Sequence, residues 1–216
     1  ALPIYLKDSF ELLYCRGLVY QRLAARELAQ HASGEPELHP LVEPGADWRY
    51  FKGVAAPPAG WKAPGFDASG WLEGKAGFGY GDEDDATELA DMQGKYPSVF
   101  LRHDFQLPGA VAGKADVLLL RVRFDDGFIA CLNGLELARA NVPGRRGEVV
   151  PHDVTANGQN EADQWEDYIV GSESLRSGRN TLTIQAHNYT LPSSDFSIEA
   201  DRKSTRLNSS HVKRPR

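Results

Sequence analysis

The chain has 216 residues, a formal net charge of −6 and 41% hydrophobic residues. This length and composition predict one sizeable domain with a buried core plus a short appendage. No apolar run approaches the roughly 18 residues of a transmembrane helix, so no membrane span is expected, and the acidic balance argues against nucleic acid as a partner.

The first predicted element is a short α-helical segment within residues 1–33. Residues 10–29 are rich in Leu, Ala, Arg and Gln, which favour helices, and apolar residues recur there at helical spacing. The segment resembles a single tetratricopeptide unit; the alternative is the end of some other upstream domain, since one unit cannot bury its own face. Residues 34–44 are polar, contain proline and are predicted to be a linker.

From residue 45 to residue 200 the pattern is all-β. Short segments rich in aromatic and aliphatic residues alternate with turn residues, and the Gly-rich residues 74–81 are predicted to be a loop. Short strands at this spacing indicate a sandwich of two sheets. The predicted strands are residues 48–52, 96–107, 117–124, 128–132, 135–138, 165–170, 181–187 and 196–200.

Two turns lie at the centre of this prediction. Asp125-Asp126-Gly127 and Asn133-Gly134 separate three apolar runs, and such turns predict three consecutive antiparallel strands. The two aspartates are interpreted as turn formers that cap backbone amides and hold a neighbouring loop. A catalytic carboxylate pair is the alternative, but consecutive residues of an extended strand point to opposite faces and do not present two carboxyls to one bond.

Several motifs in residues 45–200 occur together. They are FDASGW at 66–71, GFGYGD at 77–82, LRHDF at 101–105, DDG and LNG at 125–127 and 132–134, and AHN and SSD at 186–188 and 193–195. In this order they resemble the galactose-binding-like jelly-roll β-sandwiches of bacterial proteins, found beside calcineurin-like phosphoesterase, spore-coat-kinase-like (CotH-like) and lamin-tail domains. The resemblance implies an extracytoplasmic or secreted parent protein and an accessory module with no catalytic centre of its own.

Two binding hypotheses follow from the predicted loops. Sugar rings stack on exposed aromatic faces beside polar groups, so the candidate glycan-binding residues are Trp61, Tyr80, Arg139, Asn141, Asn188 and Tyr189. Core packing of the tryptophans is the alternative. Ca²⁺ is the one cofactor hypothesis, with Asp82, Asp84 and Asp85 as ligands completed by backbone carbonyls; a solvated acidic loop is the alternative.

Three functions remain open. The first is a non-catalytic carbohydrate-binding or accessory module, whose partner is a glycan or a neighbouring domain of the same chain. The second is a purely structural domain that packs on a neighbouring hydrolase or phosphoesterase. The third is an enzyme, for which the chain offers no metal spacing such as HExxH and no GxSxG motif.

The last 16 residues are treated separately. Residues 201–211, DRKSTRLNSSH, resemble the translation of a sequencing adaptor, so residues 201–216 are expected to be a non-native tail. A native basic tail is the alternative. These residues carry a net charge of +5, so the remainder of the chain carries −11.

Overall fold

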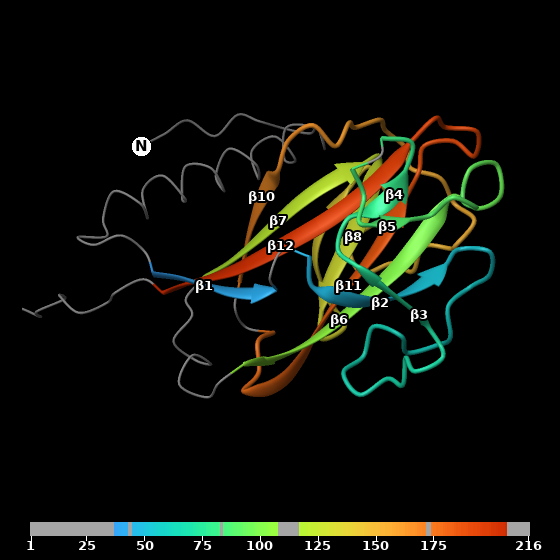
Figure 1. The fold of residues 1–216 in the computed structure, drawn as a ribbon. Helices are drawn as coiled ribbons and strands as arrows, with labels where there is room; N and C mark the ends of the chain where they lie inside the picture. Colours follow the sequence, from blue (N-terminus) through green and yellow to red (C-terminus); the bar gives the residue numbers. More distant parts are fainter. Residues whose placement is uncertain (1–36, 43–44, 83, 108–116, 172–173, 207–216) are drawn as a thin grey trace, which may run out of the picture. The chain divides into compact units, whose positions relative to one another are not determined.

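The computed structural model describes residues 37–42, 45–82, 84–107, 117–171 and 174–206 (Figure 1). These residues are all-β, as predicted, and form two six-stranded sheets. The described part of the chain contains no helix suited to span a membrane. The predicted helix at residues 10–29 lies outside the described residues.

The first sheet contains β1 (Glu37–Val42), β4 (Phe78–Tyr80), β5 (Thr87–Glu88), β7 (Val117–Asp125), β10 (Glu166–Gly171) and β12 (Phe196–Arg206). Its order is β10-β7-β12-β4-β5, with β1 paired to β12, and it is called the β7 sheet. The second sheet contains β2 (Asp47–Lys52), β3 (Leu72–Lys75), β6 (Ser98–Leu107), β8 (Gly127–Leu132), β9 (Leu135–Ala140) and β11 (Gly178–His187). Its order is β3-β2-β6-β11-β8-β9, and it is called the β11 sheet. Within these two paths the pairs are antiparallel except for the parallel pair β4 and β5.

One apolar core joins the inner faces of the two sheets. In β7, Leu120, Val122 and Phe124 alternate with partly exposed residues and are at most 2% exposed. They belong to the same buried cluster as Leu182 and Ile184 of β11. The period of two places these side chains on one face of each strand, which confirms the prediction of a two-sheet sandwich.

The outer face of the β11 sheet is covered by two long loops. The loop between β2 and β3 packs Trp61 and Trp71 on Phe100. The loop between β9 and β10 packs Val142 and Val150 on the outer face of β8. The β11 residues Asn180–His187 are consequently buried on both faces.

The chain crosses between the sheets at Asp125-Asp126-Gly127. β7 and β8 belong to different sheets, so the prediction of three consecutive antiparallel strands is wrong for this pair. It is confirmed for β8 and β9, which pair across Asn133 (φ 53°) and Gly134 (φ 87°). Gly127 is required for a different reason: a Cβ there would lie 2.7 Å from the carbonyl oxygen of Asn141.

Three segments contain β-strands that the sequence did not predict. Residues 74–81, expected to be a loop, contain the end of β3 and all of β4. Residues 34–44, expected to be a linker, contain β1. β12 continues past Ala200 into the adaptor-like residues, where Asp201–Thr205 pair with Arg121–Val117 of β7.

Candidate functional site

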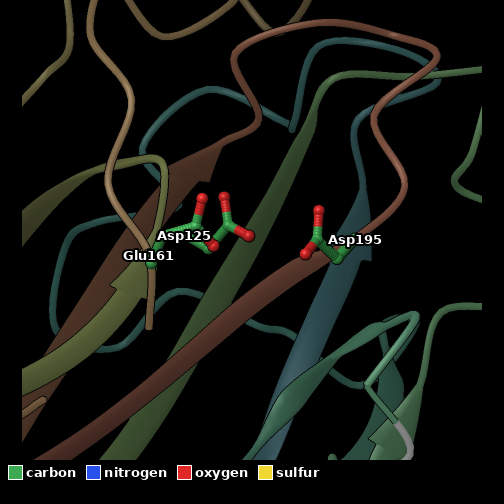
Figure 2. Close-up of side chains that lie close together, drawn as sticks. All are labelled: Asp125, Glu161 and Asp195. Atoms are coloured by element: carbon green, nitrogen blue, oxygen red, sulfur yellow. The ribbon is translucent and has the colours of Figure 1, made fainter. Parts of the chain in front are cut away.

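Three carboxylates meet at the end of the sandwich where β7 stops and β12 begins. Asp125 is the last residue of β7, Glu161 lies in the loop between β9 and β10, and Asp195 directly precedes β12. One carboxylate oxygen from each residue lies within 4.8 Å of the other two. Figure 2 shows the carboxyl groups of Asp125 and Glu161 next to each other and Asp195 across from them. These three residues are called the acidic cluster.

The carboxyl group of Asp125 is buried among other acids. The residue is 5% exposed, whereas Glu161 is exposed and Asp195 is half-buried. Burial, followed by the charges of Asp126 and Asp195, raises the pKa of Asp125 to about 8. A side-chain hydrogen bond with Asp126 also raises the pKa of Asp125.

Asp126 has similar burial but a different environment. Its Oδ1 accepts a hydrogen bond from the backbone amide of Asn160 at 3.1 Å, and its Oδ2 accepts one from the amide of Tyr189 at 2.7 Å. Its own carbonyl oxygen accepts from the side-chain amide of Asn141 at 3.0 Å. Asp126 thus fixes two loops to the crossing between the sheets, which is the loop-holding geometry expected for one member of the aspartate pair.

Three of the six candidate glycan-binding residues lie in the interior. Trp61, Tyr80 and Asn188 are at most 8% exposed. Tyr80 is in β4 and not in a loop; its hydroxyl accepts from the Asn188 side-chain amide and donates to the carbonyl of Ser193, both at 3.1 Å. Trp61 packs edge-on against Phe100, with ring centroids 5.2 Å apart. The expectation that these side chains are presented on exposed loops is therefore corrected, because each completes a buried contact.

The side chains of Arg139 and Asn141 are both occupied by contacts within the protein. The guanidinium of Arg139, in β9, donates to both carboxylate oxygens of Glu136 at 3.0 Å and to the carbonyl of Pro143 at 2.7 Å. Asn141 has a φ of 50° and donates to the Asp126 carbonyl. Both residues hold the loop that follows β9.

Tyr189 is the one exposed residue among the six candidate glycan-binding residues. Its side chain is 40% exposed, and Leu191 beside it is 42% exposed. The segment between β11 and β12, residues 188–195, is called the Tyr189 loop. It lies next to the acidic cluster, because Asp126 binds the Tyr189 amide at one end of the loop and Asp195 closes the other.

The Tyr189 loop is held along its length by hydrogen bonds to its backbone. The carbonyl of Leu191 accepts from the amide of Gly94 at 2.7 Å. The carbonyl of Ser193 accepts from the hydroxyl of Tyr80 at 3.1 Å and from the side chain of Gln93 at 2.9 Å. The side chains of Tyr189 and Leu191 are therefore exposed, whereas the backbone of the loop is fixed by these hydrogen bonds.

The three aspartates predicted to bind Ca²⁺ do not converge on one point in the described part of the chain. Asp82 and Asp84 are exposed, and Asp84 pairs with Arg123 at 3.5 Å. Asp85 turns toward β12, where its Oδ1 accepts from the hydroxyl of Ser197 at 3.1 Å, and burial raises the pKa of Asp85 to about 6. Burial and then the charge of Asp195 raise the pKa of Asp82.

The residues that sequence reasoning missed are the partners of Asp125. Asp195 was noticed only as part of the SSD motif, and Glu161 carried no signal, since a Glu in a polar loop is ordinarily a solvated surface residue. Pairing of β7 with β12 brings Asp195 close to Asp125. The hydrogen bonds of Asn160 to Asp126 and to the carbonyl of Phe124 bring Glu161 close.

No protein-family model matches this chain, and no curated protein matches it. Solved structures with partial similarity include β-glucuronidase from Bifidobacterium dentium complexed with coumarin-3-O-glucuronide (18% identity, TM-score 0.46) and a calcium binding mutant of Bacteroides uniformis β-glucuronidase 2 (13%, 0.46). A β-glucuronidase from an uncultured Clostridium sp. has 14% identity and a TM-score of 0.45. The matches cover 72%, 78% and 82% of this chain but only 21%, 18% and 30% of those chains. The likeness is confined to a fraction of each glucuronidase and carries no inference about what this chain binds.

Proposed function

We propose that residues 45–200 form a non-catalytic, carbohydrate-binding accessory module of the galactose-binding-like jelly-roll type, within a larger extracytoplasmic bacterial protein. The observation that carries the proposal is the Tyr189 loop, which presents an exposed aromatic ring on a fixed backbone. Sugar rings stack on such rings. A loop that is already fixed loses little conformational freedom on binding, so more of the contact energy appears as affinity.

The carboxylates near this loop support a binding role over a hydrolytic one. A glycosidase needs two carboxyl groups that flank the scissile bond, one of them as a base or nucleophile. Both oxygens of Asp126 are used by backbone amides, so neither is available to attack or to activate water. Asp125 is 5% exposed, which keeps a glycosidic bond from reaching it.

The test is a glycan array followed by calorimetric titration of each sugar that binds, using the full chain and its Tyr189→Ala variant. We expect saturable binding by the wild type and a loss of affinity of about two- to twelvefold in the variant, because an aromatic contact contributes about 0.5–1.5 kcal/mol. The melting temperature should change little, since Tyr189 is 40% exposed and does not belong to the buried clusters described above.

A matched pair of variants controls for nonspecific loss of apolar surface. Leu191→Ala removes an exposed side chain from the Tyr189 loop, and Leu135→Ala removes one that is 57% exposed in the hairpin at the far end of β8. The first should weaken sugar binding and the second should not. Absence of saturable binding to any sugar would refute the carbohydrate-binding proposal, and hydrolysis of a glycoside by the isolated chain would refute its non-catalytic character.

A further inference from the structure

Two of the sequence motifs meet at the Tyr189 loop. The GFGYGD motif places Tyr80 at the end of β4, and the AHN and SSD motifs place Asn188 and Asp195 at the two ends of the loop. β4 pairs with the start of β12, where Tyr80 lies opposite Phe196 (Figure 1). Tyr80 and Asn188 are 8% and 1% exposed. These two residues therefore contact the loop from the interior, where a sugar does not reach them.

The side chain of Asn188 connects the first residue of the loop to its later residues. Its Nδ2 donates to the hydroxyl of Tyr80 at 3.1 Å and to the carbonyl of Asp195 at 3.0 Å. Its Oδ1 accepts from the backbone amide of Thr190 at 3.3 Å. Both N–H donors of the side-chain amide are thus used within the protein, so Asn188 shapes the loop and has no donor left for a ligand.

The end of β4 fixes the second half of the loop in two ways. The hydroxyl of Tyr80 donates to the carbonyl of Ser193 at 3.1 Å. Gly81, with a φ of 107°, approaches the loop so closely that a Cβ there would lie 2.6 Å from the carbonyl oxygen of Ser194 and 2.9 Å from the Cα of Asp195. Glycine accepts both this φ and this approach because it has no Cβ. Residues 80 and 81 therefore set the position of the segment that closes the loop.

We propose that Tyr80 and Asn188 are positioning residues of the carbohydrate site, which touch no sugar and hold the Tyr189 loop in the conformation that presents the Tyr189 ring. This inference rests on the proposed function of the loop, and it replaces the sugar contacts that the sequence predicted for both residues. A loop that is ordered before binding loses less conformational entropy on binding. Loosening the loop from the interior should therefore lower the affinity without removing any contact to the sugar.

The first test removes one hydroxyl group from the full chain. Tyr80→Phe deletes the hydroxyl that bonds to the loop and keeps the buried ring. Tyr96→Phe is the matched control, because Tyr96 is 2% exposed and its hydroxyl donates to Asp91 at 3.0 Å, outside the loop. Calorimetric titration uses the sugar that binds most tightly in the glycan array. We expect a loss of affinity of about two- to twelvefold in Tyr80→Phe, the range for one hydrogen bond, and less than about twofold in Tyr96→Phe.

Two further measurements distinguish positioning from general destabilisation. In the Tyr189→Ala background, Tyr80→Phe should lower the affinity by less than about a further twofold, because a positioning residue acts through the ring that it positions. In the protein without sugar, hydrogen exchange at the Thr190 amide should become faster in Tyr80→Phe and not in Tyr96→Phe. A hydroxyl that contributed only to global stability would give the same affinity and the same exchange in the two phenylalanine variants.

Gly81→Ala tests the same role through shape. It should lower the affinity more than Tyr80→Phe does, whereas Gly65→Ala, at a φ of 85° with nothing within 4 Å of the added Cβ, should leave the affinity unchanged. If the wild type binds no sugar, the proposed function is refuted and this inference falls with it. If the wild type binds, this inference alone is overturned by equal affinities of Tyr80→Phe and Tyr96→Phe, by additive losses in Tyr80→Phe and Tyr189→Ala, or by unchanged exchange at the Thr190 amide in Tyr80→Phe.

Discussion

Arg102 and Asp125 are both buried ionisable residues, but the groups that surround them differ. Arg102, on the outer face of the β11 sheet, is 1% exposed and donates to the carbonyls of Trp61 at 2.8 Å and Ala63 at 2.9 Å and to Asp104 at 3.1 Å. Asp125, at the crossing between the sheets, is surrounded by other carboxyls. A buried charge whose partners come from the covering loop fixes that loop. A buried carboxyl whose neighbours carry negative charge instead has a raised pKa.

The largest expected effect comes from removing the buried charge of Arg102. Arg102→Met keeps the length of the side chain but leaves the carbonyls of Trp61 and Ala63 without this donor, while Asp104 keeps its hydrogen bonds from Arg179 and Thr181. Leaving a buried acceptor without its donor costs about 1–3 kcal/mol, so the two carbonyls should together give a loss of about 2–6 kcal/mol in urea unfolding. The loop between β2 and β3 should also loosen, which limited proteolysis measures.

The control for this variant is Arg49→Met. Arg49 pairs in register with Arg102 on the neighbouring strand, and its guanidinium donates to the carbonyls of Ser69 and Trp71 in the same loop, but its side chain is 38% exposed. Arg49 also forms an exposed ion pair with Glu73. Exposed ion pairs contribute about 0–1 kcal/mol, so this substitution should cost less than 1 kcal/mol. Equal losses in the two variants would contradict the assignment of loop anchoring to the buried charge.

The second prediction concerns a neutral polar group of the same outer face. His187 is fully buried; its Nδ1 donates to the carbonyl of Val154 at 2.6 Å, and its Nε2 has no partner among the described residues. Burial lowers the pKa of His187 to about 4. Because the unfolded chain takes up this proton near pH 6.5 and the folded protein does not, stability is complete above pH 6.5 and falls as the pH drops toward 4.

This loss amounts to about 3 kcal/mol between pH 6.5 and 4, since one pKa unit corresponds to about 1.4 kcal/mol. His187→Gln removes the titration, so the difference in unfolding free energy between wild type and variant should change by that amount over the range. The buried carboxyls Asp85 and Asp125 act in the opposite direction, because their raised pKa values add stability as the pH falls; they are present in both proteins and cancel. A difference that stays constant with pH would contradict the prediction.

Local pattern was sufficient for much of the fold. The alternation in residues 96–107 and 181–187 predicted β6 and β11, and Asn133-Gly134 predicted the β8–β9 hairpin. The Asp-Gly signal at 126–127 failed because a turn between strands of one sheet and a crossing between two sheets can use the same residues. Sheet membership depends on pairings distant in sequence, such as β7 with β12.

The candidate site was predicted less well, for the same reason. Asp125 and Tyr189 were singled out by residue type. Whether a polar side chain is available to bind a ligand depends, however, on the loops that cover the sheet. The alternating polar residues Arg102, Gln185 and His187 would be solvent-facing on a bare sheet, and here they donate to carbonyls of covering loops. Exposure of a residue such as Tyr80 or Arg139 therefore could not be read from its position in a strand or turn.

The smallest expected effect separates the two adjacent aspartates. Asp126→Asn keeps the shape of the side chain but turns one acceptor into an amide nitrogen that faces a backbone N–H of Asn160 or Tyr189. Hydrogen bonds to a charged group contribute about 1.5–3 kcal/mol, and urea unfolding in EDTA at pH 7 should show a loss in that range. Hydrogen exchange at the Tyr189 amide should become faster. Asp125→Asn under the same conditions should cost less, because burial and the charges of Asp126 and Asp195 already disfavour the ionised carboxyl. Equal destabilisation by the two substitutions would contradict the contrast between the two adjacent aspartates.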